Sequence, residues 1–263
     1  MTSTTIRMGI YKGGFGKTTA SKLFAYILSE KYNKKVLAVD TDPQSNLTET
    51  LALTFSVDLD MEKNLYNACF TETNPKENVQ SLSNNLDILS GSWDMINFEA
   101  EVYNQYKAKY INQVIKNVLI ELKDDYDYIL IDTAPTTNLV MENVLMFTDY
   151  ILVATQTVPL AYESTLKFYD YLLDFYEADN TDFELLGVLP YLVGKSATDR
   201  KLIKKYESTF EHELFHSHIR SSDRVKTWSD YGITEDKPYD KVTLEMYEKV
   251  VEESLERLNG KVD

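Results

Sequence analysis

The stretch Thr5–Thr19, TIRMGIYKGGFGKTT, decides the fold. It opens with a short apolar run, passes through three glycines and ends in Lys-Thr-Thr, where an apolar pattern of helical spacing begins. Gly13, Gly14 and Gly16 let the backbone turn tightly and aim its N–H groups inward at an anion. The start of the following helix adds the positive end of its dipole. This order of strand, glycine loop and helix predicts a phosphate-binding loop.

Each residue type after the glycines suits one part of a nucleotide. Lys17 would reach the β- and γ-phosphates, the Thr18 hydroxyl would bind Mg²⁺, and Thr19 could contact the α-phosphate side. The candidate nucleotide-binding residues of the loop are Lys12, Gly13, Gly14, Phe15, Gly16, Lys17, Thr18 and Thr19. The common loop pattern has glycine at position 11, but this chain has Tyr11, followed by an additional lysine, Lys12. The alternative interpretation of Lys12 is an ordinary solvated surface charge.

The rest of the chain alternates between apolar runs and helical patterns. Four continuous runs are typical of strands covered on both faces, with Thr5–Tyr11 as a fifth: Val36–Val39, Tyr128–Ile131, Ile151–Ala154 and Leu185–Leu189. Apolar residues at helical spacing lie between and after them; the sets are Leu23, Phe24, Ile27, Leu28; Ile111, Val114, Ile115, Val118, Leu122; Leu166, Tyr169, Leu173, Tyr176; and Leu244, Tyr247, Val251, Leu255, Leu258. The pattern predicts an α/β fold, a doubly wound and mostly parallel sheet with helices on both faces.

We expect residues 1–263 to form a single P-loop domain, because no repeat, linker or low-complexity tract divides them. The segment Leu53–Trp93 is the least regular and should hold short helices and loops. The formal net charge of −15 argues against binding nucleic acid through overall charge. The lone Cys69 excludes an internal disulfide and a cysteine-rich metal site, and no signal peptide or membrane-spanning run is expected.

Two further motifs carry carboxylates: VDTDPQSNLT over Val39–Thr48 and ILIDTAP over Ile129–Pro135. A Mg²⁺-nucleotide site needs carboxylates at the carboxyl ends of neighbouring strands. Asp132 ends one apolar run and is predicted, with Thr18, to hold the Mg²⁺. Asp40 ends another run, and its place among the metal-site residues is implied by the family resemblance described next. An alternative for Asp40 and Asp42 is that they only cap the turn before Pro43.

Together the three motifs resemble those of the deviant-Walker ATPases, which include the partition ATPase ParA, the division-site protein MinD and the nitrogenase iron protein. The resemblance implies ATP and Mg²⁺ as cofactors and ATP hydrolysis with weak basal activity. It implies that Lys12 reaches the nucleotide of a partner subunit across a dimer interface, and that Asp42 positions or activates the attacking water. Lys12, Lys17 and Asp42 are therefore the predicted catalytic residues.

Within this superfamily the sequence favours ParA. The iron protein needs cysteine ligands that this chain lacks, and MinD needs a basic membrane-binding tail, whereas Thr243–Leu258 is acidic. Val188–Val193 and Val225–Thr234 resemble the small, delta-type ParA proteins of plasmids. We expect no helix-turn-helix domain before the first strand. The resemblance implies a cytoplasmic, nucleoid-associated DNA-segregation ATPase that dimerises on ATP and does not bind membrane. It also implies a small centromere-binding partner of the ParB kind, for which a ribbon-helix-helix protein is one candidate. The alternative is a dimerising scaffold or positioning protein with non-DNA cargo or negligible turnover.

A local basic segment is the candidate DNA-binding surface. Residues 195–226 hold eight basic and five acidic residues in an otherwise acidic chain. With the ParA resemblance, the candidates for non-specific DNA contact are Arg220, Arg224, Lys204 and Lys205. The alternative is that these charges form the solvated face of an ordinary helix.

Three remaining features bear on the site. His212–His216 matches the zinc-protease pattern H-E-x-x-H, but we expect it where a helix ends and a strand begins, which does not suit a zinc protease. Pro190 and Tyr191 stand where the family often has an adenine-reading asparagine, so they are candidate nucleotide contacts. Gln156 matches a Thr-Gln pair of the family and is a candidate for the dimer face.

Overall fold

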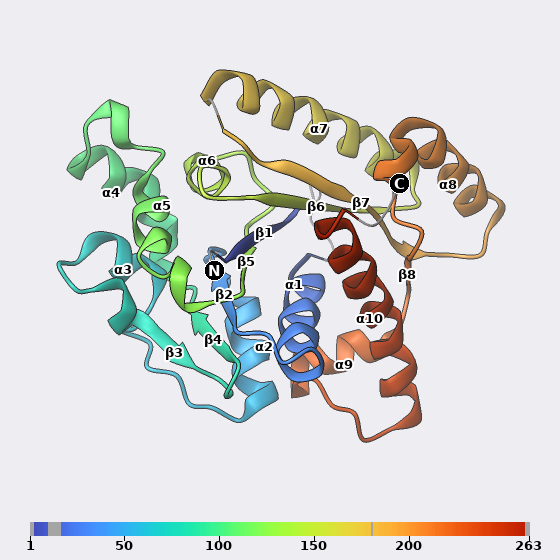
Figure 1. The fold of residues 1–263 in the computed structure, drawn as a ribbon, viewed down its shortest axis with the longest axis horizontal. Coiled ribbons are helices and arrows are strands. Elements are labelled where there is room, and N and C mark those ends of the chain that lie inside the picture. Colours follow the sequence, from blue (N-terminus) through green and yellow to red (C-terminus); the bar gives the residue numbers. More distant parts are fainter. Residues whose placement is uncertain (1–2, 10–16, 180, 261–263) are drawn as a thin grey trace.

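The computed structural model describes residues 3–9, 17–179 and 181–260, and the side chains of Lys17 and Asp179 are not among the described parts. Its centre is an eight-stranded sheet in the order β3-β4-β2-β5-β1-β6-β7-β8, with helices on both faces (Figure 1). The strands are β1 (Thr4–Gly9), β2 (Val36–Asp40), β3 (Val79–Ser81), β4 (Leu86–Leu89), β5 (Tyr128–Asp132), β6 (Tyr150–Gln156), β7 (Glu184–Val193) and β8 (Ile219–Arg220). Neighbouring strands run parallel except for the antiparallel pair β3 and β4.

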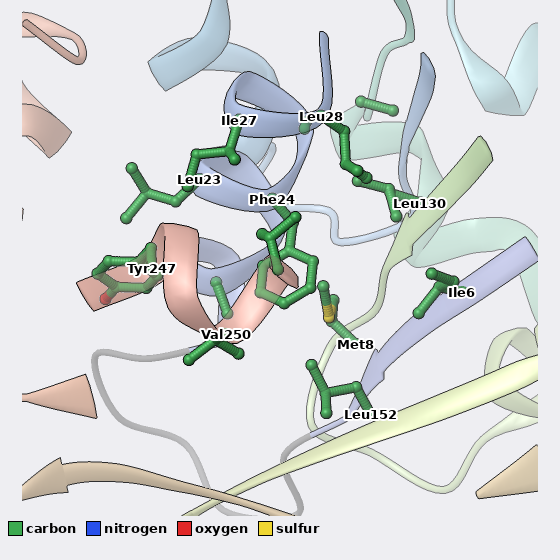
Figure 2. Packing of buried hydrophobic residues seen from close by; sticks show 14 of the residues in the cluster. Ile6, Met8, Leu23, Phe24, Ile27, Leu28, Leu130, Leu152, Tyr247 and Val250 are labelled. Carbon is green, nitrogen blue, oxygen red and sulfur yellow. The ribbon is translucent and has the colours of Figure 1, made fainter. Parts of the chain in front are cut away.

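The helices divide into two layers around this sheet. They are α1 (Lys17–Tyr26), α2 (Asn46–Phe55), α3 (Leu65–Phe70), α4 (Phe98–Gln105), α5 (Val114–Ile120), α6 (Leu139–Leu145), α7 (Pro159–Asp179), α8 (Ala197–Phe210), α9 (Asp223–Tyr231) and α10 (Pro238–Leu258). A π-helical turn, Ile27–Lys31, extends α1. The core on the α1 and α10 side joins β1 to both helices, and Figure 2 shows Phe24 and Val250 meeting Met8 there. Two further buried clusters lie on the opposite face, under α3 to α8.

All five predicted strands are present, although the described part of β1 ends at Gly9. The sequence missed β3, β4 and β8. Strand β4 is only LDIL, in which Asp87 interrupts the apolar run, and β8 has two residues. Strands this short give no period to detect. The irregular segment Leu53–Trp93 does contain short helices and loops, but it also contributes the sheet edge formed by β3 and β4.

The prediction of which face of α7 is buried is wrong. Leu173 and Tyr176 of the predicted set are 47% and 45% exposed. The residues that α7 buries are Tyr162, Thr165, Phe168, Leu172 and Phe175. Because α7 carries apolar residues on adjoining stripes, helical spacing alone admits both choices. Leu166 and Tyr169 pack at the margin of the cluster, so the two stripes adjoin.

The final helix agrees with its prediction as an acidic helix that packs on the core. Leu244, Tyr247 and Val251 of α10 are buried against α1 and the sheet, while Leu255 and Leu258 are partly buried beside them. In the described residues no helix combines the length and apolarity needed to cross a membrane.

Candidate nucleotide-binding site

Two buried carboxylates mark the carboxyl edge of the sheet. Asp40 ends β2 and Asp132 ends β5, and they face each other in the register of the two parallel strands. Both side chains are completely buried. Thr41 secures the neighbouring backbone, since its amide and its hydroxyl donate to the Asp132 carbonyl oxygen at 3.0 and 2.9 Å. The sheet thus places the two predicted metal-site carboxylates side by side.

Asp132 is tied to the first turns of α1. Thr18 Oγ1 donates to Asp132 Oδ2 at 2.8 Å, and Ser21 Oγ donates to Asp132 Oδ1 at 2.8 Å. Thr18 and Ser21 lie three residues apart and share one side of the helix. The predicted pair of Thr18 and Asp132 is therefore together in the structure. Ser21 was missed, although its spacing from Thr18 was a usable signal.

Asp40 holds the segment that follows it. Its Oδ1 accepts from the Asp42 amide at 3.1 Å, and its Oδ2 accepts from the Thr48 amide and hydroxyl at 3.0 and 2.9 Å. Thr48 Oγ1 in turn accepts from the Gly91 amide at 2.9 Å. A side chain at Gly91 would come within 3.0 Å of the Asp40 carboxyl carbon. Sequence reasoning gave no function to Thr48 or Gly91, because side-chain bonding to a distant loop leaves no local pattern.

Burial raises the pKa of Asp40 to about 7, and the nearby carboxylate of Asp132 adds to the rise, against the hydrogen bonds from Thr48 and Asp42. A cation bound at this edge would favour the ionised form. Both carboxylate oxygens of Asp40 are nevertheless engaged in holding residues 42–48. In this structure Asp40 holds the loop that follows β2, while Asp132 is the carboxylate that accepts a hydrogen bond from Thr18.

Asp42 lies half-buried beyond the end of β2. Its Oδ1 accepts from the Gln44 amide at 3.0 Å, so it does cap the turn at Pro43, as the alternative interpretation had it. This hydrogen bond also fixes the orientation of the Asp42 carboxylate at the carboxyl edge of the sheet, where Asp132 lies. Capping this turn leaves the second predicted role of Asp42, the orientation of the attacking water, as a prediction.

The glycine loop itself lies outside the described residues, so the structure does not place the predicted Lys12, Gly13, Gly14, Phe15 and Gly16. Its flanks are described: β1 ends at Gly9 beside β5, and α1 begins at Lys17. A helix start, a threonine hydroxyl and buried carboxylates are the donors and hard oxygen ligands that a Mg²⁺-nucleotide needs. The described residues therefore fit such a ligand.

The prediction that the Tyr191 ring contacts the nucleotide is corrected by the structure. Tyr191 has no exposed surface, and its hydroxyl lies 2.6 Å from that of Tyr247 on α10. Thr19, also buried, hydrogen-bonds the same hydroxyl. A ring enclosed in the core cannot stack on a base, and Pro190, its neighbour along β7, faces the opposite side of the strand. Aromatic character alone could not distinguish a core ring from a base-stacking ring.

The four predicted DNA contacts differ in their surroundings. Arg220, at the end of the edge strand β8, and Lys204, on α8, are exposed, and neither has an ion pair with another described residue. Lys205 lies 3.7 Å from Glu163 and over the ring of Tyr162. Gln156 ends β6 and accepts, through its carbonyl, a bond from Tyr206.

Arg224 is engaged inside the fold. Its Nε donates to Asp240, which is fully buried, and its Nη2 donates to Thr234 Oγ1 at 3.0 Å. The side chain is only 18% exposed, and the guanidinium lies 5.2 Å from the ring centre of Tyr239. These contacts give Arg224 a structural role, so it is a weaker DNA candidate than Arg220. The sequence could not reveal a partner 16 residues away.

Replacing Arg224 with methionine is expected to destabilise the fold by about 2–3 kcal/mol, because Asp240 would lose its cation while staying buried. Lys226→Met is the matched control, since Lys226 only pairs with exposed Asp223, and we expect a change below about 0.5 kcal/mol. Urea unfolding of both variants measures the difference. Equal stabilities would contradict the structural role of Arg224.

The H-E-x-x-H match lies where it was expected. Helix α8 ends at Phe210, the short 3₁₀ turn Glu211–Glu213 follows, and β8 begins at Ile219. His216 is therefore not on a helix with His212. In the described residues no group of three or more His, Cys, Asp or Glu side chains could hold a metal ion.

Comparisons with known proteins identify the family of this chain. A family model described as an AAA domain matches residues 3–185. The sporulation initiation inhibitor protein Soj of Bacillus subtilis is 26% identical over 84% of this chain and 85% of its own length. The virulence plasmid ParA family protein pGP5-D of Chlamydia psittaci is 25% identical over 80% of this chain and 78% of its own. Three further curated relatives, all uncharacterized proteins, match over only 54% or 46% of their own length.

Among solved structures, a plasmid partition protein of Borrelia burgdorferi bound to AMPPNP superposes with a TM-score of 0.80 at 22% identity, over 99% of this chain and 100% of that one. This likeness confirms the fold, the mostly parallel α/β sheet with helices on both faces that the sequence predicted.

Proposed function

This chain belongs to the AAA-domain family and is a ParA-type ATPase, and we propose that it is a DNA-segregation ATPase. ATP binding joins two copies into a dimer, the dimer binds DNA without sequence preference, and hydrolysis releases it. The observation that carries the proposal is the Thr18 hydroxyl held on Asp132, directly after a glycine loop with the additional Lys12. Residues 1–263 act as one domain in this proposal.

ATP and Mg²⁺ are the cofactors. The metal would be held by Thr18, with Asp132 in its shell, and would neutralise charge on the transferred phosphoryl group. Asp40 keeps the loop of Asp42 in place through the Asp42 amide and Thr48. The loop amides around Gly13, Gly14 and Gly16 bind the phosphates, with Lys17 beside them.

Hydrolysis in this site depends on position and charge more than on covalent chemistry. Asp42 orients the water whose oxygen attacks the γ-phosphorus, and the bond to the ADP oxygen breaks. Lys12 of the partner neutralises the charge that develops on the transferred group. Because this lysine comes from the second subunit, ATP binding, dimerisation and turnover become linked.

DNA binding by an acidic chain requires a local surface. Arg220 and Lys204 are exposed cations without a described ion-pair partner, and Lys205 is exposed beside a single glutamate. A dimer presents two such surfaces at once, which raises affinity through effective concentration and makes DNA binding depend on ATP. The protein would then associate with the nucleoid in the cytoplasm, and a small ParB-like partner would stimulate release.

Arg220→Glu is expected to weaken binding to all DNA sequences alike and to lower the slope of log affinity against log salt by about 1 for each phosphate that the variant no longer neutralises. Lys63→Glu, at an exposed loop position before α3, makes the same charge change as a control and should leave the slope unchanged. Fluorescence anisotropy of two unrelated duplexes at several salt concentrations measures both. An unaltered slope for Arg220→Glu would remove this residue from the interface.

The whole proposal is tested by a DNA titration with ATP, with ADP and without nucleotide. We expect tight binding only with ATP. An equal response in all three conditions would contradict the switch and favour a positioning protein with other cargo.

A further inference from the structure

Helix α9 lies next to the proposed DNA-binding surface. It begins at Asp223, three residues after Arg220, and packs against both α2 and α10. Trp228 of α9 is fully buried in the core on the α1 side of the sheet. Arg220 itself lies on β8, which pairs with β7, and α9 is the helix that directly follows it along the chain.

Lys22 connects this helix to the nucleotide side. It lies on α1 one helical turn after Thr18, its side chain is only 2% exposed, and its Nζ donates to Ser229 Oγ on α9 at 2.9 Å. Its neighbour in sequence, Ser21, donates to Asp132. One short helical segment thus contacts the Mg²⁺-site carboxylate on one side and α9 on the other.

We propose that Lys22 is a positioning residue that couples the nucleotide site at the start of α1 to α9, so that nucleotide occupancy is passed to the helix that directly follows Arg220. The proposal rests on the proposed function for its consequence at DNA, but the coupling itself is a property of α1 and α9.

A buried lysine is a costly way to join two helices. Burial lowers the pKa of Lys22 to about 8, with the nearby carboxylate of Asp230 acting in the opposite direction. An apolar side chain of similar length would fill the same space without that desolvation cost. The Lys22 ammonium adds a directional hydrogen bond to one atom of α9. Small shifts of α1 would break or keep this bond.

The segment after α9 is held to the same two helices. The Ile233 amide donates to Thr54 Oγ1 of α2 at 2.9 Å, and Tyr26 of α1 donates to Glu235 at 2.8 Å. Gly232, with φ of +82°, approaches α2 so closely that a side chain would meet the Thr54 backbone at 2.8 Å. A shift of α1 and α2 would therefore move α9 as a rigid unit. Of the contacts that join α9 and the segment after it to α1 and α2, the one made by Lys22 lies nearest to the nucleotide.

The chain offers a reporter for this movement, since its two tryptophans are Trp93, which is exposed, and Trp228. In a Trp93→Phe background the emission of Trp228 can be recorded on addition of ATP or ADP. We expect ATP to change this emission, and Lys22→Met to reduce the change at least about fivefold while ATP affinity by calorimetry stays within about twofold.

Lys63→Met is the matched control, because Lys63 is exposed in the loop before α3 and lies on neither α1 nor α9. It should retain the full response. Ser229→Ala removes the acceptor from the α9 side at an exposed position and should reproduce the loss, which keeps the test decisive if Lys22→Met folds poorly.

A Trp228 response to ATP that survives in Ser229→Ala or in a folded Lys22→Met variant would overturn the inference, as would no response in the parent protein with ATP bound. DNA affinity is measured in a separate experiment. If the Trp228 response depends on Lys22 but ATP leaves DNA affinity unchanged, the coupling stands and the proposed function fails.

Discussion

Replacing Lys12 with alanine is expected to lower ATP turnover by about 10³-fold or more, since a cation supplied across an interface is worth about 10³ to 10⁵ in rate. ATP binding should persist, because Lys17 and the loop amides of the same subunit remain. Single-turnover phosphate release and calorimetry separate the two effects.

Two further variants serve as controls for Lys12→Ala. Lys17→Ala should abolish ATP binding itself, because its ammonium belongs to the same subunit's phosphate site. Lys34→Ala, at a partly exposed position before β2, should change neither binding nor rate. Wild-type turnover by Lys12→Ala would identify Lys12 as a solvated surface charge.

Asp42→Asn is expected to lower turnover by about 10²-fold or more, the usual contribution of a group that orients and activates water. The asparagine oxygen can still accept the bond from the Gln44 amide, so the turn is kept and only the charge is lost. The ATP-bound dimer should then persist on DNA. Phosphate release and the lifetime of the DNA complex measure the two consequences.

Glu49→Gln removes an exposed charge from neighbouring α2 and should leave both measurements unchanged. A normal rate in Asp42→Asn would reduce the role of Asp42 to capping the turn at Pro43.

The sequence predicted the part of the fold that carries the site, because β2 and β5 are continuous apolar runs that each end in a carboxylate. Their register, and therefore the meeting of Asp40 with Asp132, follows from parallel pairing. The edge strands were missed because β3, β4 and β8 are too short to show a period. On α7 two adjoining apolar stripes left the buried face undecided, and the wrong one was chosen.

Within the site, residue type predicted what each group can do but not what it touches. Thr18 and Asp132, both predicted for the metal site, do lie within hydrogen-bond distance of each other. Tyr191 and Arg224 were assigned to ligands, yet the fold supplies internal partners, Tyr247 and Asp240. Ser21 and Thr48 support the two carboxylates through bonds that only the folded chain brings together.

The most direct test of the central claim, that Lys12 acts on the partner's nucleotide, is to mix Lys12→Ala with Asp42→Asn and measure turnover. Each variant alone is inactive, but a mixed dimer has one site that combines an intact Asp42 with an intact Lys12 from the other subunit. Random pairing predicts recovery to about a quarter of the wild-type rate per subunit for such two-fold dimers. A mixture no more active than the separate variants would contradict the account.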